Sequence, residues 1–134
     1  MKRIFLKTMA VLLACIFITA CGSHKTLESV MSTDSAQKEI EDVRSKLLTE
    51  HGDVYGDYEV KVSQNDIVYE YYYIPDYTDE MLESVKKVLE ADTSWSDTVN
   101  SVKDEIEQTS LIRPDTVTFA YYSSDGREIF RVTE

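Results

Sequence analysis

Cysteine, proline and glycine are all scarce in this chain of 134 residues, which has two cysteines, two prolines and four glycines. Low proline and glycine, together with 43% apolar residues, exclude a disordered polymer or a collagen-like fibre. Basic residues are also few, since 14 Lys and Arg face 25 Asp and Glu for a formal charge of −11. Nucleic-acid binding is therefore excluded, because contacts to phosphates need clustered cations. The length favours a single domain.

The first twenty residues have the pattern of a signal peptide. Met1–Lys7 supplies a basic start, and Thr8–Ala20 is an uncharged, mainly apolar run. As a helix this run would span roughly 20 Å, which is short of the roughly 30 Å hydrocarbon core of a bilayer. The basic flank, the short apolar run and the small residues at its end favour a cleaved signal over a transmembrane anchor.

The end of this run, Ile18-Thr19-Ala20-Cys21-Gly22-Ser23, resembles the lipobox of bacterial lipoprotein precursors. In those precursors the thiol of the cysteine receives a diacylglyceryl group, and the peptide is cut just before that cysteine. The resemblance implies that residues 1–20 are removed and that Cys21 becomes the lipidated first residue. Two acyl chains anchor a protein durably, so we expect it at the outer face of the cell membrane.

Two other processing sites fit the sequence less well. A lipobox ending at Cys15 would shorten the apolar run and place Ile16-Phe17-Ile18 directly after the lipid. Ordinary secretory cleavage after Ala20 would put the bulky side chain of Ile18 at a position that favours small residues. Lipidation at Cys21 remains the prediction.

Processing at this site changes both the chemistry and the charge of the chain. No free thiol is left, because Cys15 is removed and Cys21 carries the lipid. Disulfides, thiolate catalysis and cysteine-based metal sites are then excluded. Loss of Lys2, Arg3 and Lys7 leaves 11 cations against 25 acids, a formal charge of −14. Such a domain is repelled by anionic headgroups over about 8–10 Å.

The periodicity of the first half of the mature chain predicts a helix followed by a hairpin. Apolar side chains recur every three or four positions over residues 36–47, and Gly52 is a good residue to end that helix. Alternation with a period of two then begins at Tyr58–Val62 and returns at Ile67–Ile74. The polar residues 64–66 between these runs predict a turn, and hence two antiparallel strands.

The second half repeats this order. Apolar residues at heptad-like spacing extend over residues 81–106, and Asp92-Thr93-Ser94 interrupts them. This stretch predicts either one kinked helix or two helices, and two are favoured because a straight one would overhang so small a domain. Val117–Tyr122 and Glu128–Thr133 then alternate on either side of Asp125-Gly126, which is a strong turn signal.

These elements follow one another in the order α-β-β-α(α)-β-β and predict an α+β fold. Residues 21–26 form a lipidated, flexible tether, and residues 27–134 form a single domain. We expect a two-layer sandwich in which two hairpins make a four-stranded antiparallel sheet with helices on one face. The order of the strands in the sheet is not given by these patterns.

Tyrosines crowd into the second predicted strand and the residues after it, with five of them in residues 69–77. In a strand, Tyr69, Tyr71 and Tyr73 face one side of the sheet, and Tyr72 faces the other side with Glu70. If Tyr72 and Tyr122 lie on an open side, they form an aromatic platform for a glycan or a peptide, because tyrosine combines a rigid ring with a polar tip. Alternatively, tyrosine simply suits a half-buried sheet.

No residue pattern singles out a catalytic residue, a metal site or a cofactor, and we assign none of the three. Asp76, Asp79 and Glu80 cluster at a helix start, but they lack the spacing of a calcium loop, and helix capping accounts for them. His24 lies in the tether and His51 at a helix end, so they do not form a metal site. The four glycines are too scattered to cradle a phosphate.

Several of these features together resemble a family of small Gram-positive bacterial lipoproteins with a domain of unknown function. They are the lipobox, the Leu27–Met31 segment, the Asp57–Ile74 hairpin, the amphipathic middle and an ending of the form Tyr-Tyr, Asp-Gly and Ile-Phe. The resemblance covers nearly all of the mature chain. It implies a location and a fold, and it implies no activity.

Three functions stay open at this point. The first is a non-enzymatic module that binds an envelope protein or a cell-wall glycan. The second is an envelope hydrolase that uses carboxylates on a glycan, because acidic residues are abundant enough to supply a pair. The third is a structural protein that self-associates through a sheet edge.

Overall fold

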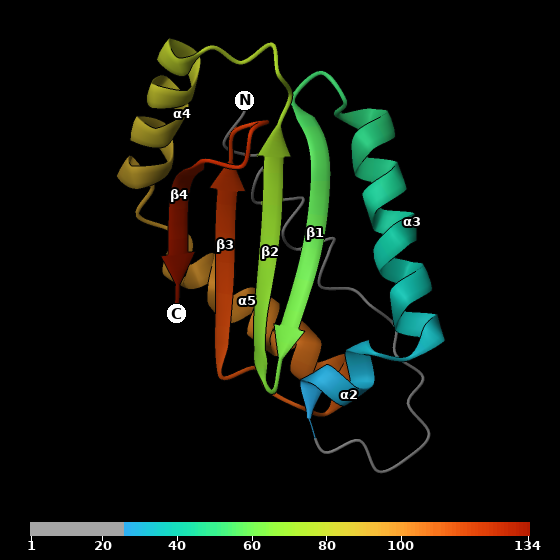
Figure 1. Ribbon diagram of the computed structural model, residues 1–134. Helices are drawn as coiled ribbons and strands as arrows, with labels where there is room; N and C mark the ends of the chain where they lie inside the picture. Colours follow the sequence, from blue (N-terminus) through green and yellow to red (C-terminus); the bar gives the residue numbers. More distant parts are fainter. Residues whose placement is uncertain (1–25) are drawn as a thin grey trace.

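The structure is a computed structural model that describes residues 26–134. The predicted signal peptide and the predicted lipidation site at Cys21 lie outside the described residues. In chain order the elements are the helices α2 (Leu27–Met31) and α3 (Asp34–Glu50), the strands β1 (Tyr55–Ser63) and β2 (Asp66–Tyr73), the helices α4 (Asp79–Ala91) and α5 (Trp95–Ser110), and the strands β3 (Thr116–Tyr122) and β4 (Glu128–Thr133) (Figure 1). The predicted order of helices and hairpins is confirmed.

The stretch that predicted one kinked helix or two is two helices. Helix α4 begins where the hydroxyl of Thr78 accepts a hydrogen bond from the amide of Met81, and it ends at Ala91. The carboxylate of Asp92 then accepts from the amide of Ser94 at 2.9 Å, which turns the chain. Ser94 is the N-cap of α5 but makes no capping bond with its own side chain, so Asp92 supplies the polar contacts of this corner.

The four strands form one sheet in the order β1-β2-β3-β4. Both hairpins are antiparallel, as predicted, but the central strands β2 and β3 pair in parallel, from Asp66 opposite Thr116 to Tyr72 opposite Tyr122. The sheet is therefore mixed and only mostly antiparallel. The reason is the long connection through α4 and α5, which returns the chain to the end of the sheet at which β2 began. The α+β fold class itself is confirmed.

The helices leave one face of the sheet uncovered by any described helix. Figure 1 shows α5 crossing behind the sheet, α3 along β1 and α4 along β4. Apolar side chains of these three helices pack against the core together with the inward side chains of the strands. Within residues 26–134 no helix is long and apolar enough to cross a membrane.

The core between sheet and helices is built largely from tyrosine. The ring of Tyr71 stacks on that of Tyr121 with centroids 4.9 Å apart, and Tyr69 stacks in the same way on Phe119. Six of the nine tyrosines are buried, namely Tyr55, Tyr58, Tyr69, Tyr71, Tyr73 and Tyr121. The hydroxyls of Tyr69, Tyr71 and Tyr121 have no hydrogen-bond partner among the described residues. Each such buried hydroxyl costs about 1–3 kcal/mol, which the stacked ring area must offset.

We predict that this tyrosine core makes the domain unfold steeply at alkaline pH. Burial raises the pKa of all six phenols in the folded state, because the low-dielectric interior disfavours phenolate. The unfolded chain ionises near pH 10 and releases protons that the folded chain retains, so the free energy of unfolding falls as the pH rises above about 10. Tyrosinate absorbance and far-ultraviolet circular dichroism, followed together from pH 8 to 12, measure this coupling. We expect most tyrosinate to form as the helix signal is lost. Ionisation of all nine tyrosines with the helix signal intact would contradict the prediction.

Candidate functional site

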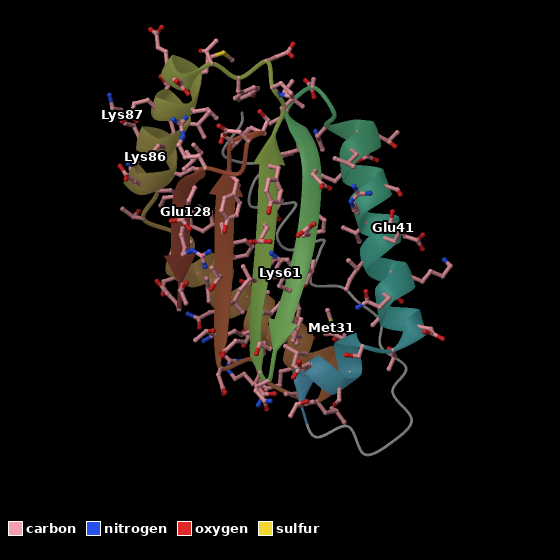
Figure 2. The ribbon with its side chains drawn as sticks, in the orientation of Figure 1. Met31, Glu41, Lys61, Lys86, Lys87 and Glu128 are labelled. Carbon is pink, nitrogen blue, oxygen red and sulfur yellow. The ribbon has the colours of Figure 1, made fainter. Side chains whose placement is uncertain are left out.

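The uncovered side of the sheet, which we call the open face, is the candidate functional site. Its side chains alternate with those of the core along each strand and form three rows across the sheet. Glu70 and Ala120 lie at its centre, between Glu59 of β1 and Arg131 of β4 in the pairing register. Figure 2 shows Lys61 over the middle of this face and Glu128 at its outer strand.

The two tyrosines predicted for an open face are brought together there. The parallel register of β2 and β3 sets Tyr72 directly opposite Tyr122, and their rings stack with centroids 5.0 Å apart and planes 19° apart. Both side chains are partly exposed. Each ring therefore covers one face of the other, and a ligand would contact their outer faces and edges. The pair is a stacked ridge across two strands.

Hydrogen bonds fix the hydroxyl end of each ring. The guanidinium of Arg131 donates to the hydroxyl of Tyr122 at 2.9 Å, and the hydroxyl of Tyr72 lies 3.5 Å from the Glu70 carboxylate, to which it donates. Partial burial is the main cause that raises the pKa of Tyr72, and the negative charge of Glu70 is the second. Burial and a hydrogen bond with Glu70 raise that of Tyr122. Both phenols stay neutral at physiological pH and remain hydrogen-bond donors.

Glu70 is a residue of the site whose role the sequence analysis missed. Although it lies on the open face, it is only 5% exposed. The ammonium of Lys61 reaches its carboxylate from β1 at 2.7 Å, and Tyr72 contacts the same group. The spacing of Glu70 and Tyr72, two residues apart on one strand, was the available signal. The pairing with Lys61 depends on the register of β1 against β2, which that signal does not contain.

A second ion pair completes the contacts on β4. Arg131 binds Glu128 at 2.7 Å as well as Tyr122. A continuous line of contacts thus crosses all four strands, through Lys61, Glu70, Tyr72, Tyr122, Arg131 and Glu128. Both cations on this line are matched by carboxylates. The arrangement offers aromatic surface flanked by polar groups held in place, which suits non-covalent binding.

The acidic cluster at the start of α4 is tied to the neighbouring hairpin. Asp79 forms an ion pair with Arg127 at 2.7 Å, and both residues line a groove of about 310 Å³ between α4 and the start of β4. Lys86 and Glu128, both labelled in Figure 2, line this groove too. No group of three His, Cys, Asp or Glu residues within 26–134 is arranged to hold a metal ion. His51 is the C-cap of α3, and His24 lies outside the described residues.

Comparison with known proteins identifies the family of the domain. Residues 27–133, from the start of α2 to the end of β4, match a domain of unknown function, DUF4854. The chain belongs to the DUF4854 family. No curated protein and no solved structure matches it. The DUF4854 match includes the helical layer, the tyrosine core and the open face, so the candidate site lies wholly inside the family domain. The family resemblance found in the sequence is confirmed as far as this domain is concerned.

We predict that the Lys61–Glu70 pair stabilises the DUF4854 domain more than an exposed ion pair does. Lys61→Met leaves a buried carboxylate without its cation, and the free energy of unfolding should fall by about 1–2 kcal/mol. Lys38→Met is the matched control, because Lys38 and Asp42 form an equally short but exposed pair within α3. Its loss should cost less than about 0.5 kcal/mol. Urea unfolding of a soluble form that lacks residues 1–21 measures both. Equal losses for the two variants would show that Glu70 is not effectively buried.

Proposed function

We propose that this protein is a surface-anchored lipoprotein of a Gram-positive bacterium and that its DUF4854 domain is a non-enzymatic binding module of the cell envelope. The lipobox ending in Cys21 supports the anchor, and the open face supports the binding role. The partner is an envelope protein or a cell-wall glycan. Extracytoplasmic location follows from the same signal, because the lipid is added outside the cytoplasm in the precursors that the N-terminus resembles.

The observation that carries the binding role is the stacked pair of Tyr72 and Tyr122 on a face that no described helix covers. Tyrosine contributes a large rigid contact area at low entropic cost, and it is enriched among the residues that dominate binding energies. The hydroxyls are already held by Glu70 and Arg131, so little ordering of these rings is needed when a partner binds.

The state of the nearby carboxylates favours binding over hydrolysis. A glycosidase needs one carboxyl group presented to the scissile bond as an acid and a second one close to it. Glu70 is buried, accepts from the hydroxyl of Tyr72 and forms an ion pair with Lys61, and Glu128 forms one with Arg131. Both are engaged as ion pairs within the fold. We therefore favour recognition as the role of this face.

Replacing the aromatic pair should abolish partner capture. In cells that produce the anchored, tagged protein, cross-linking and mass spectrometry identify what the wild-type protein traps. Tyr72→Ala with Tyr122→Ala should reduce the yield of that partner at least tenfold, because two central aromatic contacts are lost. Met81→Ala is the control, since Met81 is an exposed apolar residue of α4 away from the open face. Unchanged capture by the double variant would remove the open face from the proposal.

The anchor is tested separately from the face. Cys21→Ser should shift the protein from the membrane fraction to the medium or the soluble fraction and abolish incorporation of labelled fatty acid. Cys15→Ser should change neither result, because we expect Cys15 to leave with the signal peptide. Retention of Cys21→Ser in the membrane fraction, or loss of labelling in Cys15→Ser, would assign the anchor to another residue.

A further inference from the structure

Three segments that are distant in the sequence meet at one end of the sheet, which we call the basal end. They are the start of α2, the β1–β2 turn and the loop of residues 111–115 (Figure 1). The amide of Leu27 donates to the side chain of Asn65 at 2.9 Å, and the amide of Asp115 donates to the Asn65 carbonyl at 2.8 Å. The first described residues of the domain are thus fixed to this end by hydrogen bonds.

Leu111 is the most exposed large apolar side chain of the described chain, and it lies in the loop of the basal end. Its side chain is 87% exposed and its φ is +62°, a left-handed conformation. That conformation at the end of a helix favours glycine and costs a leucine free energy. The next residue, Ile112, packs against the core. Ile112 therefore contributes to the core. Leu111 has a strained backbone conformation and an apolar side chain that lies outside the core.

The length of the tether limits how far the basal end can lie from the membrane. Five residue steps separate Cys21 from Thr26, and a fully extended chain covers at most about 17 Å in that number. The interfacial region of a bilayer is itself several ångströms deep. An anchored domain that is free to tilt can therefore bring the start of α2, and the loop beside it, into contact with the headgroups.

We propose that the basal end faces the bilayer and that Leu111 inserts into the interface of a neutral lipid surface. This inference rests on the proposed anchor at Cys21. Neutral lipid is the occupant because acids outnumber cations here, and anionic headgroups would repel them. Glu28, Asp66 and Asp115 lie at or beside this end. The cation of the loop, Arg113, is already paired with Asp104 and Glu107, and Lys103 donates to the carbonyl of Asp115. The contact accounts for an exposed leucine in a conformation that glycine would adopt without strain.

The same orientation places the binding site away from the membrane. Strand β2 begins at the basal end with Asp66 and reaches Tyr72 six residues later, which is about 20 Å further along the strand. The stacked pair then lies in the half of the domain that is turned toward the cell wall. The β3–β4 turn lies at the other end of the sheet, away from the lipid (Figure 1).

Fluorescence quenching by labelled lipid tests this orientation with the full chain. The protein is produced in a host that lipidates it, with Ser63→Cys at the basal end or Ser124→Cys in the β3–β4 turn, and a fluorophore is attached to the new thiol. After processing no other free thiol remains. The probe is a phosphatidylcholine vesicle with doxyl groups on its lipids. We expect several-fold stronger quenching of the label at residue 63 than of the label at residue 124.

Variants at Leu111, made in the chain labelled at residue 63, test the contact itself. Leu111→Gly relieves the left-handed strain, so the domain stays folded, but the apolar side chain is lost. The population in contact with lipid should fall roughly tenfold, the factor expected for burial of one leucine side chain. Leu111→Met keeps an apolar side chain and should retain the quenching. Replacing part of the phosphatidylcholine with phosphatidylglycerol should weaken it at low salt.

The failure of this inference can be distinguished from the failure of the anchor. Flotation of the vesicles shows whether the protein is attached, and a chain that does not float would overturn the anchor and the orientation together. Attached protein with equal quenching at residues 63 and 124 would overturn the orientation alone. Unequal quenching that is unchanged in Leu111→Gly would overturn the role of Leu111.

Discussion

The parallel pairing of β2 with β3 is the constraint on which the rest of this structure depends. Because α4 and α5 carry the chain across one face and back to the same end, two tyrosine-rich strands lie side by side in register. The register stacks Tyr71 on Tyr121 toward the helices and Tyr72 on Tyr122 toward the opposite side. Core and candidate site are thus two faces of a single strand pair, and a shift of one residue would exchange them.

Tyrosine hydroxyls have different environments on the two faces of the sheet. Toward the helices, the hydroxyls of Tyr69, Tyr71 and Tyr121 are buried without a partner among the described residues, and these rings contribute area and stacking rather than hydrogen bonds. On the open face, the hydroxyls of Tyr72 and Tyr122 are held by Glu70 and Arg131 and remain at the surface. The same residue type therefore serves as packing material on one side and as a fixed, solvent-accessible contact on the other. Most acidic residues of the domain lie on its helices and loops, whereas both cations of the open face, Lys61 and Arg131, are paired with carboxylates.

Most of the fold could be predicted from local patterns. Periods of 3.6 and 2 identify the helices and strands, Asp125-Gly126 marks a turn in which Gly126 has a φ of +87°, and alternation alone puts Tyr72 opposite in direction to Tyr71. The prediction of an all-antiparallel sheet was wrong for the central pair, β2 and β3, which is parallel. Alternation of side chains does not say which strand lies beside which. The ion pair of Lys61 with Glu70 was missed for the same reason, since it depends on register. The exposure of Leu111 follows from the left-handed end of α5, where the sequence has no glycine to indicate it.

The connection between β2 and β3 also determines the order in which the domain can fold. Each hairpin closes over a short turn and can form within microseconds. The centre of the sheet must wait for residues 116–122, because no earlier segment pairs with that edge of β2. Until then, a strand with five large side chains in a row from Tyr69 to Tyr73 keeps one edge open. Pairing of β3 with β2 is thus the long-range, slow step of folding. It buries the core tyrosines and assembles the stacked pair on the other face. A chain that stalled before this step would expose an unpaired, tyrosine-rich strand edge and would lack the stacked pair of Tyr72 and Tyr122.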